Sequence, residues 1–371
     1  MKTIKKLLSV SLLLVLGSFL IACGNKSDTT TTTSTPAPTI ASSEAATPEA
    51  TAENVDATTG ETYPDVINIG VIEGGPESAI LVQEKLLENL GVKANIVSYS
   101  AGTDINNAVV SGDVDLACFG SSPIALGLAN GINYKAVYVS YLEGGNIEAL
   151  VVKNSAGLNS VAELKGKTIA TPFGTTSHYA LLNALELAGL SASDVSLLDM
   201  GGADIVAAWT RGDIDATYIW SPAQDECVKD GKILTNDGEL AEQGITIPEI
   251  AVARNEFAEK YPTLVTAYVK ALISVSDLVN NDPEKATEDV AAWEGISVDS
   301  AKGQVNDNIW ISGADQLTGD YLGTADSKGK LADTLKTIAD FHAEQGNLGS
   351  SPDVSLFKDA IDTSYVEAAL K

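Results

Sequence analysis

Cysteine and histidine are scarce in this sequence, which has three cysteines and two histidines in 371 residues. His178 and His342 are not grouped with cysteines at zinc-ligand spacing. Cys118 and Cys227 fall in different predicted units, so no disulfide framework is readable, and we expect inert thiols. A Gly-x-Ser-x-Gly elbow, a Walker-type Gly-Lys-Ser/Thr loop and a dinucleotide-binding glycine fingerprint are absent. We therefore expect no metal and no cofactor.

Positive charge is the second shortage. The chain carries 23 Lys and Arg against 50 Asp and Glu, a formal net charge of −27. This balance disfavours nucleic acid and other polyanionic partners. Acidity is otherwise a common means of keeping a secreted protein soluble.

The N-terminus has the pattern of an export signal. Three lysines near the start precede the apolar run 7–21, which is too short for a membrane span of ~20 residues. Leu20-Ile21-Ala22-Cys23 ends this run and resembles the lipobox of bacterial lipoproteins. We expect residues 1–22 to be a signal peptide and Cys23 to be lipidated. The alternative is an ordinary secretory signal with an incidental cysteine.

The segment that follows has a different composition. Residues 23–63 hold the lipidated Cys and a Thr-, Pro- and Ala-rich stretch that includes the run Thr29–Thr33. Such a segment has too little apolar surface to offset its ordering entropy, so we expect a disordered tether. About 38 flexible residues reach ~35 Å root-mean-square.

From about residue 64 onward, short apolar runs alternate with helical patterns, which predicts an α/β fold. The expected strands span 66–72, 94–99, 115–119, 134–141, 148–152, 168–173, 195–199, 214–220 and 250–253. A helix is expected over 78–90 and another over 179–189, and after about residue 258 the pattern is helical.

One unit occurs twice, about 100 residues apart. Ser111-Gly112-Asp113-Val114-Asp115 precedes an apolar run and Ser122-Pro123, and Arg211-Gly212-Asp213-Ile214-Asp215 precedes another and Ser221-Pro222. Each reads as a helix with a Gly C-cap, a buried strand, and a new helix with Ser as N-cap and Pro at N1. The repeat predicts two facing α/β lobes, with ligands beyond the carboxyl ends of the strands. The alternative is a common helix-to-strand turn that carries no such meaning.

Two loops have the residues of anion sites. Gly120-Ser121-Ser122 lies where a strand ends and a helix starts, and Gly174-Thr175-Thr176-Ser177-His178 repeats this logic in the other half. Backbone N–H groups and hydroxyls at a helix N-terminus bind anions, although simple helix capping also explains part of the pattern. Neither loop contains Lys or Arg, which favours a compact, singly charged anion such as a sulfonate or carboxylate.

Acidic and aromatic side chains supply the other half of a possible site. Glu148 follows the Gly144-Gly145 turn and starts an apolar strand, and Asp215 opens another. Either carboxylate suits a cation, although a solvated surface position is the more common fate of an acidic residue. Aromatic walls are expected from Trp220, Trp209 and Tyr218, whose ring faces also attract ammonium groups.

Catalysis is poorly supported by the same residues. His342 lies in an exposed-looking run, Phe341 to Glu344. His178 follows Ser177, but neighbouring positions on a helix do not face one another. We therefore expect a binding protein rather than an enzyme.

The stretch from Gly112 to about Lys270 resembles the taurine-binding proteins of bacterial ABC importers, within a larger group that binds sulfonates and nitrate. The resemblance rests on Gly112-Asp113-Val114, Phe119 to Pro123, Gly145 to Lys153, Thr175 to Tyr179, Ala207-Ala208-Trp209, Arg211 to Asp215, Tyr218 to Ala223 and Phe257 to Pro262. The loop Glu73-Gly74-Gly75-Pro76-Glu77 departs from the family pattern, because it is more acidic and richer in glycine, and it would add a cation contact.

The resemblance implies the type II periplasmic-binding-protein clamshell, with two α/β lobes joined by two hinge crossings. Lobe 1 would comprise 64–152 plus 248–371, and lobe 2 would comprise 153–247. The implied contacts to a sulfonate are Ser121, Ser122, Thr175, Thr176 and Ser177, with His178 beside them. Glu148 and Asp215 would bind an ammonium group, and Trp220 would form a wall.

The implied function is capture of taurine or a similar sulfonate and delivery to an ABC permease and, through it, an ATPase. The protein would be a monomer held by its lipid on the outer face of the cell membrane. The alternatives are another small anion (an alkanesulfonate or a nitrate-like ion) and a sensory lipoprotein without transport. Thiamin pyrimidine synthases resemble the same fold, but they carry a Cys-rich motif that this sequence lacks.

Overall fold

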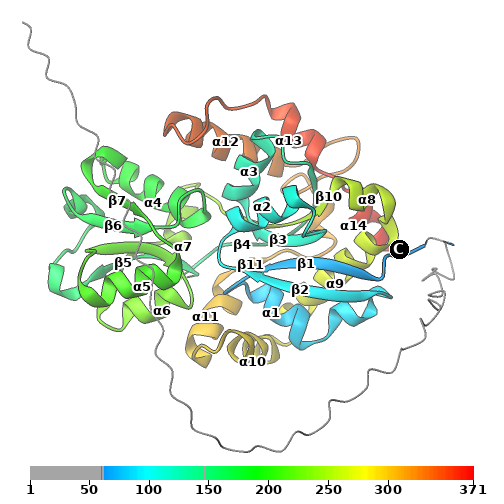
Figure 1. The fold of residues 1–371 in the computed structure, drawn as a ribbon, viewed down its shortest axis with the longest axis horizontal. Coiled ribbons are helices and arrows are strands. Elements are labelled where there is room, and N and C mark those ends of the chain that lie inside the picture. The colour runs from blue at the N-terminus through cyan, green and yellow to red at the C-terminus, as the bar shows by residue number, and fades with distance from the viewer. Residues whose placement is uncertain (1–59, 61, 146) are drawn as a thin grey trace, which may run out of the picture. The chain divides into compact units, whose positions relative to one another are not determined.

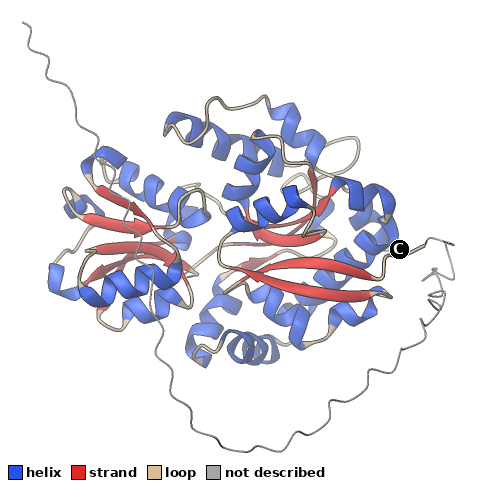
Figure 2. Cartoon of the chain, in the orientation of Figure 1, coloured by secondary structure: helices blue, strands red, loops and turns tan. Residues whose placement is uncertain are grey.

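The structure is a computed structural model that describes residue 60 and residues 62–371 except residue 146. Two separate β-sheets organise the folded residues (Figures 1 and 2). The expected signal peptide 1–22, Cys23 and nearly all of the expected tether lie outside the described residues. What the sequence predicts for them stays a prediction.

The first sheet has six strands in the order β11-β4-β10-β3-β1-β2. They are β1 (Val66–Ile72), β2 (Lys93–Tyr99), β3 (Leu116–Gly120), β4 (Tyr134–Leu142), β10 (Pro248–Arg254) and β11 (Ile309–Trp310). β1 runs parallel to β2 and β3, whereas β10 lies antiparallel between β3 and β4. β3 is buried along its whole length, because helices cover both faces of the sheet.

The second sheet has five strands in the order β7-β6-β8-β5-β9. They are β5 (Glu148–Lys153), β6 (Thr168–Thr171), β7 (Ser196–Asp199), β8 (Ala216–Trp220) and β9 (Gly231–Asn236). β6 pairs in parallel with β7 and β8, and β5 lies antiparallel between β8 and β9. Both sheets are therefore mixed, as expected of a two-lobed α/β protein.

Helices cover both faces of each sheet (Figure 1). Those near the first sheet are α1 (Pro76–Gln83), α2 (Gly102–Ser111), α3 (Ser121–Ala129), α8 (Asn255–Lys260), α9 (Pro262–Asn281), α10 (Pro283–Glu294), α11 (Val298–Asp307), α12 (Leu331–Glu344), α13 (Val354–Ala360) and α14 (Ser364–Ala369). Those near the second sheet are α4 (Thr176–Leu187), α5 (Gly202–Arg211), α6 (Ala223–Val228) and α7 (Asp237–Glu242).

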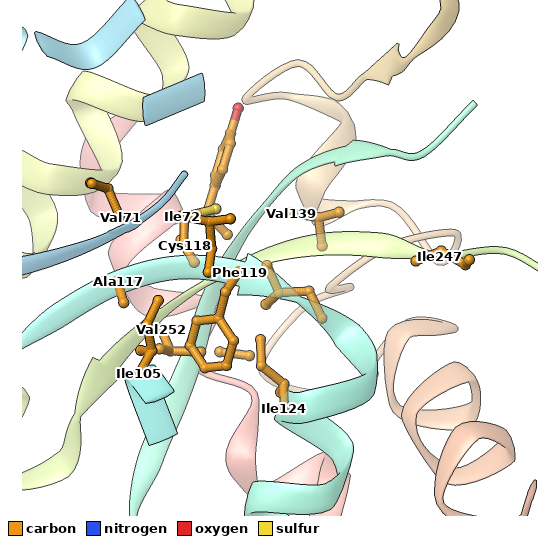
Figure 3. Packing of buried hydrophobic residues seen from close by; sticks show 14 of the residues in the cluster. Val71, Ile72, Ile105, Ala117, Cys118, Phe119, Ile124, Val139, Ile247 and Val252 are labelled. Atoms are coloured by element: carbon orange, nitrogen blue, oxygen red, sulfur yellow. The ribbon is translucent and has the colours of Figure 1, made fainter. Parts of the chain in front are cut away.

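The core of the first sheet is a continuous apolar layer (Figure 3). Phe119 and Val252 from the sheet pack there with Ile105 of α2 and Ile124 of α3. α9 has the length and hydropathy of a membrane span, but half of its apolar window is buried, as in the core helix of a folded domain. Cys118 and Cys227 lie as free buried thiols in different cores.

Most of the expected strands are confirmed, but three local expectations are wrong. β9 is a strand that the sequence analysis missed, and β11 adds a short strand after residue 258. The expected helix 78–90 is divided, because Lys85 adopts a left-handed conformation after α1 and a separate 3₁₀ turn, Leu86–Leu90, follows. Sequence periodicity does not reveal such a break.

The chain passes between the sheets twice, through residues 143–147 and through residues 237–247. Glu143 N–H donates to Ile247 O at 2.8 Å, so the two crossings touch. The expected boundary placed the first crossing after Val152. It is wrong, because β5 belongs to the second sheet and the chain therefore crosses before Glu148. Below, the first lobe means the part around the six-stranded sheet, and the second lobe the part around the five-stranded sheet.

The repeated unit occurs in both lobes. Gly112 and Gly212 each end a helix in the left-handed conformation. Asp115 Oδ2 accepts from Asn68 N–H at 3.0 Å, and Asp215 Oδ2 accepts from Thr168 N–H at 2.9 Å. Each aspartate thus ties the start of its own strand to the start of the neighbouring one. The expected Ser N-caps are wrong, because Gly120 and Pro222 occupy the cap positions of α3 and α6.

Candidate functional site

A cavity of about 40 Å³ lies where the two lobes meet. Its lining includes Ile72, Gly74, Gly75, Gly102, Gly120, Pro123, Tyr141 and Glu249 from the first lobe, and Glu148, Thr175, Thr176 and Trp220 from the second. Glu143 and Ile147 of the first crossing complete it. One water needs ~10–15 Å³, so the cavity suits only a compact solute.

Four helices begin at this cavity. Gly75, Gly120 and Thr175 are the N-caps of α1, α3 and α4, and Gly102 is the first residue of α2. A helix N-terminus carries a partial positive charge and free N–H groups. The expectation that ligands would meet helix N-termini beyond the strand ends therefore agrees with the position of the cavity.

Three carboxylates line the same cavity, and no Lys or Arg in the described part of the chain does so. Glu143, Glu148 and Glu249 are each at most 5% exposed. Glu249 Oε2 and Glu143 Oε2 have no hydrogen-bond partner. The cavity therefore combines helix dipoles that favour an anion with buried carboxylates that favour a cation.

Glu148 lies against the loop that was expected to bind an anion. Thr176 Oγ1 donates to Glu148 Oε1 at 2.6 Å, and Ser177 Oγ donates to Glu148 Oε2 at 2.9 Å. Thr175 Oγ1 donates to Pro172 O at 2.6 Å and caps α4 by accepting from His178 N–H. The three hydroxyls of this loop thus already have partners within the protein, and two of them serve Glu148.

Burial controls the ionisation of the cavity carboxyls. It raises the pKa of Glu148 well above its usual range, and the charge of Asp237 adds to this, while the Thr176 and Ser177 hydroxyls oppose it. Burial also raises the pKa of Glu249, with help from the charges of Glu77 and Glu148. Glu148 and Glu249 come from different lobes, and both line the cavity.

Three acidic residues of the site were missed by the sequence analysis. Glu143 lies in the first crossing and Asp237 at the start of α7, where Tyr218 Oη donates to its Oδ1 at 2.7 Å. Glu249 is the one acidic residue of strand β10, which is apolar except for Glu249 and for Arg254 at its end. An acidic side chain inside a buried strand was the available signal for Glu249.

Asp237 joins Glu143 and Glu148 in a compact group. Carboxylate oxygens of these three residues lie within 4.8 Å of one another, a spacing that also suits a divalent cation with oxygen ligands. Burial raises the pKa of Asp237 to about 6, although its hydrogen bonds with Glu143 and Tyr218 lower that pKa. It raises the pKa of Glu143 well above its usual range, and the charges of Glu148 and Asp237 add to this. The raised pKa values favour protonation of these carboxyls, which relieves the repulsion between them.

In the first expected anion loop, Gly120 lines the cavity, whereas Ser121 and Ser122 are buried and do not. Ser121 Oγ is fully buried without a partner. Ser122 Oγ and His342 Nε2 share a hydrogen bond of 2.8 Å, and Ser122 Oγ also lies 3.4 Å from Gly174 O of the facing loop. The two loops thus meet one another across the lobes, as expected, but neither serine lines the cavity.

His342 is buried, not exposed as the sequence suggested. It lies 6.4 Å, centroid to centroid, from His178, which stacks on Phe173 and accepts from Gly174 N–H at its Nδ1. Burial lowers the pKa of each histidine to about 4. His178 belongs to the interface between the lobes and does not line the cavity.

Asp215 does not lie with Glu148, contrary to the expectation that both would bind one ammonium group. β5 and β8 are antiparallel, with Glu148 opposite Trp220 and Val152 opposite Ala216. Asp215 therefore lies at the far end of the sheet, where it holds Thr168. The repeated Gly-Asp-[Ile/Val]-Asp pattern marks a strand start, which explains its acidic residues without a ligand.

The aromatic expectations divide in the same way. Trp220 lines the cavity, and its Nε1 donates to Glu73 O of the opposite lobe at 3.1 Å. Trp209 is buried in the second core, with Lys153 above its ring and Nε1 donating to Asp230. Tyr218 lies behind the cavity, against Asp237. Of these three expected aromatic residues, Trp220 alone lines the cavity.

Residues 87–286 of this chain match the model of the NMT1/THI5-like family. The taurine-binding periplasmic protein of Escherichia coli K12 is 34% identical over 257 residues, which cover 67% of this chain and 77% of that protein.

Solved structures share the fold at lower identity. The alkanesulfonate-binding protein SsuA from Xanthomonas axonopodis pv. citri, bound to MOPS, superposes with a TM-score of 0.68 at 22% identity, covering 81% of this chain and 99% of SsuA. The desulfurization enzyme DSZB superposes with a TM-score of 0.59 at 15% identity, covering 83% of this chain and 99% of the enzyme. These likenesses establish the type II periplasmic-binding-protein fold.

Proposed function

Because this chain belongs to the NMT1/THI5-like family, we propose that it is the solute-binding component of an ABC importer that captures taurine or a similar small aminosulfonate. The observation that carries this proposal is the composition of the cavity between the lobes. Helix N-termini and buried carboxylates line one small space. A compact zwitterion satisfies both, whereas an alkanesulfonate without an amine leaves the carboxylates uncompensated.

The two ends of the solute can be assigned from the partners already present. Glu148 lies against the first turn of α4, Glu249 Oε2 lies near Gly120, and Glu77 lies in the first turn of α1, where its own N–H and Ser78 stabilise its carboxylate. Buried carboxylates thus face three of the four helix N-termini, whereas Asp104, in the first turn of α2, is exposed. We place the ammonium group among Glu143, Glu148 and Glu249, and the sulfonate at the start of α2, beside Gly102.

Capture requires the lobes to separate and close. Trp220 bonds to Glu73 O, and Ser300 Oγ donates to Asp225 Oδ1 at 2.7 Å, so contacts between the lobes cover the cavity. A solute enters when these contacts open and is held when they form again, a hinge motion about the crossings 143–147 and 237–247. The closed form would then dock on the permease, which passes the solute on with energy from its ATPase.

A catalytic role has little support from the same site. The cavity-lining residues include no Cys, His or Lys among those the structure describes. His178 and His342 contact Gly174 and Ser122, outside the cavity. We therefore propose a binding protein. The likeness to DSZB concerns the fold alone.

The N-terminal sequence adds a proposal on location. We propose that Cys23 carries the lipid and that residues 24–63 tether the folded body above the membrane, close to its permease. Metabolic labelling with a palmitate analogue should mark the full chain but not its Cys23→Ala variant. Equal labelling of both would contradict the anchor.

A panel of three solutes tests the proposed function. Calorimetry of residues 64–371 with taurine, ethanesulfonate and ethanolamine separates the contributions of the two ends. We expect taurine to bind at least ~100-fold more tightly than either single-ended solute, because each buried charged group left without a partner costs about 1–3 kcal/mol or more. Equal affinity for taurine and ethanesulfonate would show that the carboxylates do not bind the ammonium group.

The variant Asp215→Asn tests the corrected role of that residue. We expect it to lower the free energy of unfolding by about 1 kcal/mol, because the bond to Thr168 N–H loses a charged acceptor. The affinity for taurine should stay within twofold of the parent, as measured by calorimetry. A selective loss of taurine over ethanesulfonate would return Asp215 to the ligand site.

A further inference from the structure

The carboxylates of the cavity come from both lobes. Glu148 starts β5 in the second sheet, and Glu249 lies in β10 of the first sheet, opposite Gly120 of β3 and Tyr141 of β4. Both line the cavity, and both are at least nine-tenths buried. A closed protein therefore brings together two acidic groups that separate when the lobes open.

Glu249 has the features of an unfilled binding position. Its Oε2 is buried without any hydrogen-bond partner, although it faces a cavity. None of the ion pairs among the described residues includes Glu249, Glu148 or Glu143. Burying a carboxylate without a cation or a set of donors is costly, so a cationic partner from outside the chain would stabilise this arrangement.

We propose that Glu249 and Glu148 form a clamp in which the cationic group of the solute lies between the two lobes and bonds to both carboxylates. This inference rests on the proposed function and assigns its selectivity to a residue of β10. In the empty protein the two carboxylates repel one another and favour the open state. An ammonium or other compact cation reverses this repulsion, because it attracts both, so it promotes closure as well as binding.

A solute without a cation closes the clamp only if the carboxyls take up protons. The other titratable groups that face the pair are Glu77 of α1, Cys118 of β3, Tyr141 of β4, Glu143 of the crossing, Tyr218 of β8 and Asp237 of α7. Each of them is neutral or negative, so none can replace the cation. The preference for taurine over ethanesulfonate should therefore increase with pH, because only the ethanesulfonate complex binds the extra protons.

The test uses Glu249→Gln and Glu148→Gln, with Glu259→Gln as the matched control, since Glu259 is exposed on α8. Calorimetry should show that Glu249→Gln weakens taurine about 100-fold and leaves ethanesulfonate within threefold or tighter. The double variant should lose much less than the product of the single losses, because one cation serves both carboxylates. The control should match the parent for both solutes.

Each outcome bears on a different statement. If the parent binds taurine and Glu249→Gln binds it within threefold, the clamp is wrong and the proposed function stands. If the parent binds ethanolamine better than taurine and Glu249→Gln no longer binds ethanolamine tightly, the clamp stands and the aminosulfonate assignment fails. A parent that binds none of the three solutes overturns both. Should Glu249→Gln fail to fold, the parent alone decides, because a taurine preference that stays unchanged over the whole pH range in which the protein is folded also excludes the clamp.

Discussion

The variant Gly120→Ala is expected to bind taurine about 10- to 100-fold more weakly than the parent while keeping a normal fold. Gly120 precedes α3 in the first lobe, and a Cβ placed on it would overlap Thr176 Cγ2 of the second lobe. Its φ of −61° suits alanine, so the change causes no local backbone strain. The overlap exists only when the lobes are closed.

The size of this effect follows from the packing of the two loops. Thr176 cannot readily turn away, because its hydroxyl donates to Glu148 at 2.6 Å and its backbone lies in the first turn of α4. Overpacking of a tight contact costs about 1–3 kcal/mol. Because this cost arises only in the closed state, the affinity for taurine should fall roughly 10- to 100-fold. Calorimetry measures the loss, and small-angle scattering should show that saturating taurine compacts the parent more than the variant.

Gly201→Ala is the matched control for this prediction. Gly201 precedes α5 in the second lobe as Gly120 precedes α3, with a φ of −73°, and its Cβ would meet nothing within 4 Å. We expect this variant to bind and close like the parent. Gly120→Ala with unchanged affinity would show that the loops do not approach in the solute-bound protein.

The architecture was predictable because periodicity and turn residues report on it locally. The strand Val66–Ile72 has its expected limits, and Gly112 and Gly212 mark two equivalent helix ends. β9 was missed because only one of its residues, Thr235, is buried, so its sequence lacks the apolar run of an inner strand. The break at Lys85 depends on the packing around it and leaves no periodic signal.

The sequence indicated which loops lie at the candidate site but not which charged groups those loops contact. Strand ends with Gly and hydroxyl residues identified the loops at Gly120 and Thr175, and both line the cavity. The sequence cannot show which anion those loops face. In the structure Glu148 accepts from the hydroxyls of Thr176 and Ser177, so the protein itself supplies the anion that this loop contacts. Asp215 was wrongly predicted as a ligand contact. Like Asp115 in the matching unit, it accepts from a backbone N–H of the neighbouring strand, which is a structural role.

The closure of the solute-free protein is expected to strengthen as the pH falls. Burial raises the pKa values of Glu143, Glu148 and Glu249 in the closed state, so that state binds more protons than the open one. Closure is therefore favoured as the pH falls through these raised pKa values. Each extra proton bound changes the equilibrium about tenfold per pH unit.

The histidines oppose this trend in more acidic solution. Burial lowers the pKa of His178 and of His342 to about 4, and their rings face one another across the lobes. Separation of the lobes exposes both rings and returns their pKa values toward 6.5, so below that pH the open state binds more protons. Between about pH 6 and pH 4 the two histidines therefore oppose the three carboxyls, so closure should depend less steeply on pH there than at higher pH.

Small-angle scattering of residues 64–371 without solute, from pH 4 to 8.5, measures the radius of gyration and so the degree of closure. Two double variants separate the effect of the carboxyls from that of the histidines. Glu148→Gln/Glu249→Gln should stay compact above pH 6.5, because amides cannot ionise. His178→Gln/His342→Gln should keep closing as the pH falls below 6, since the opposing protonation is gone. A radius of gyration that does not change with pH would show that the carboxyls are as hydrated in the closed protein as in the open one. The solute would then not need a cation to bring Glu148 and Glu249 together.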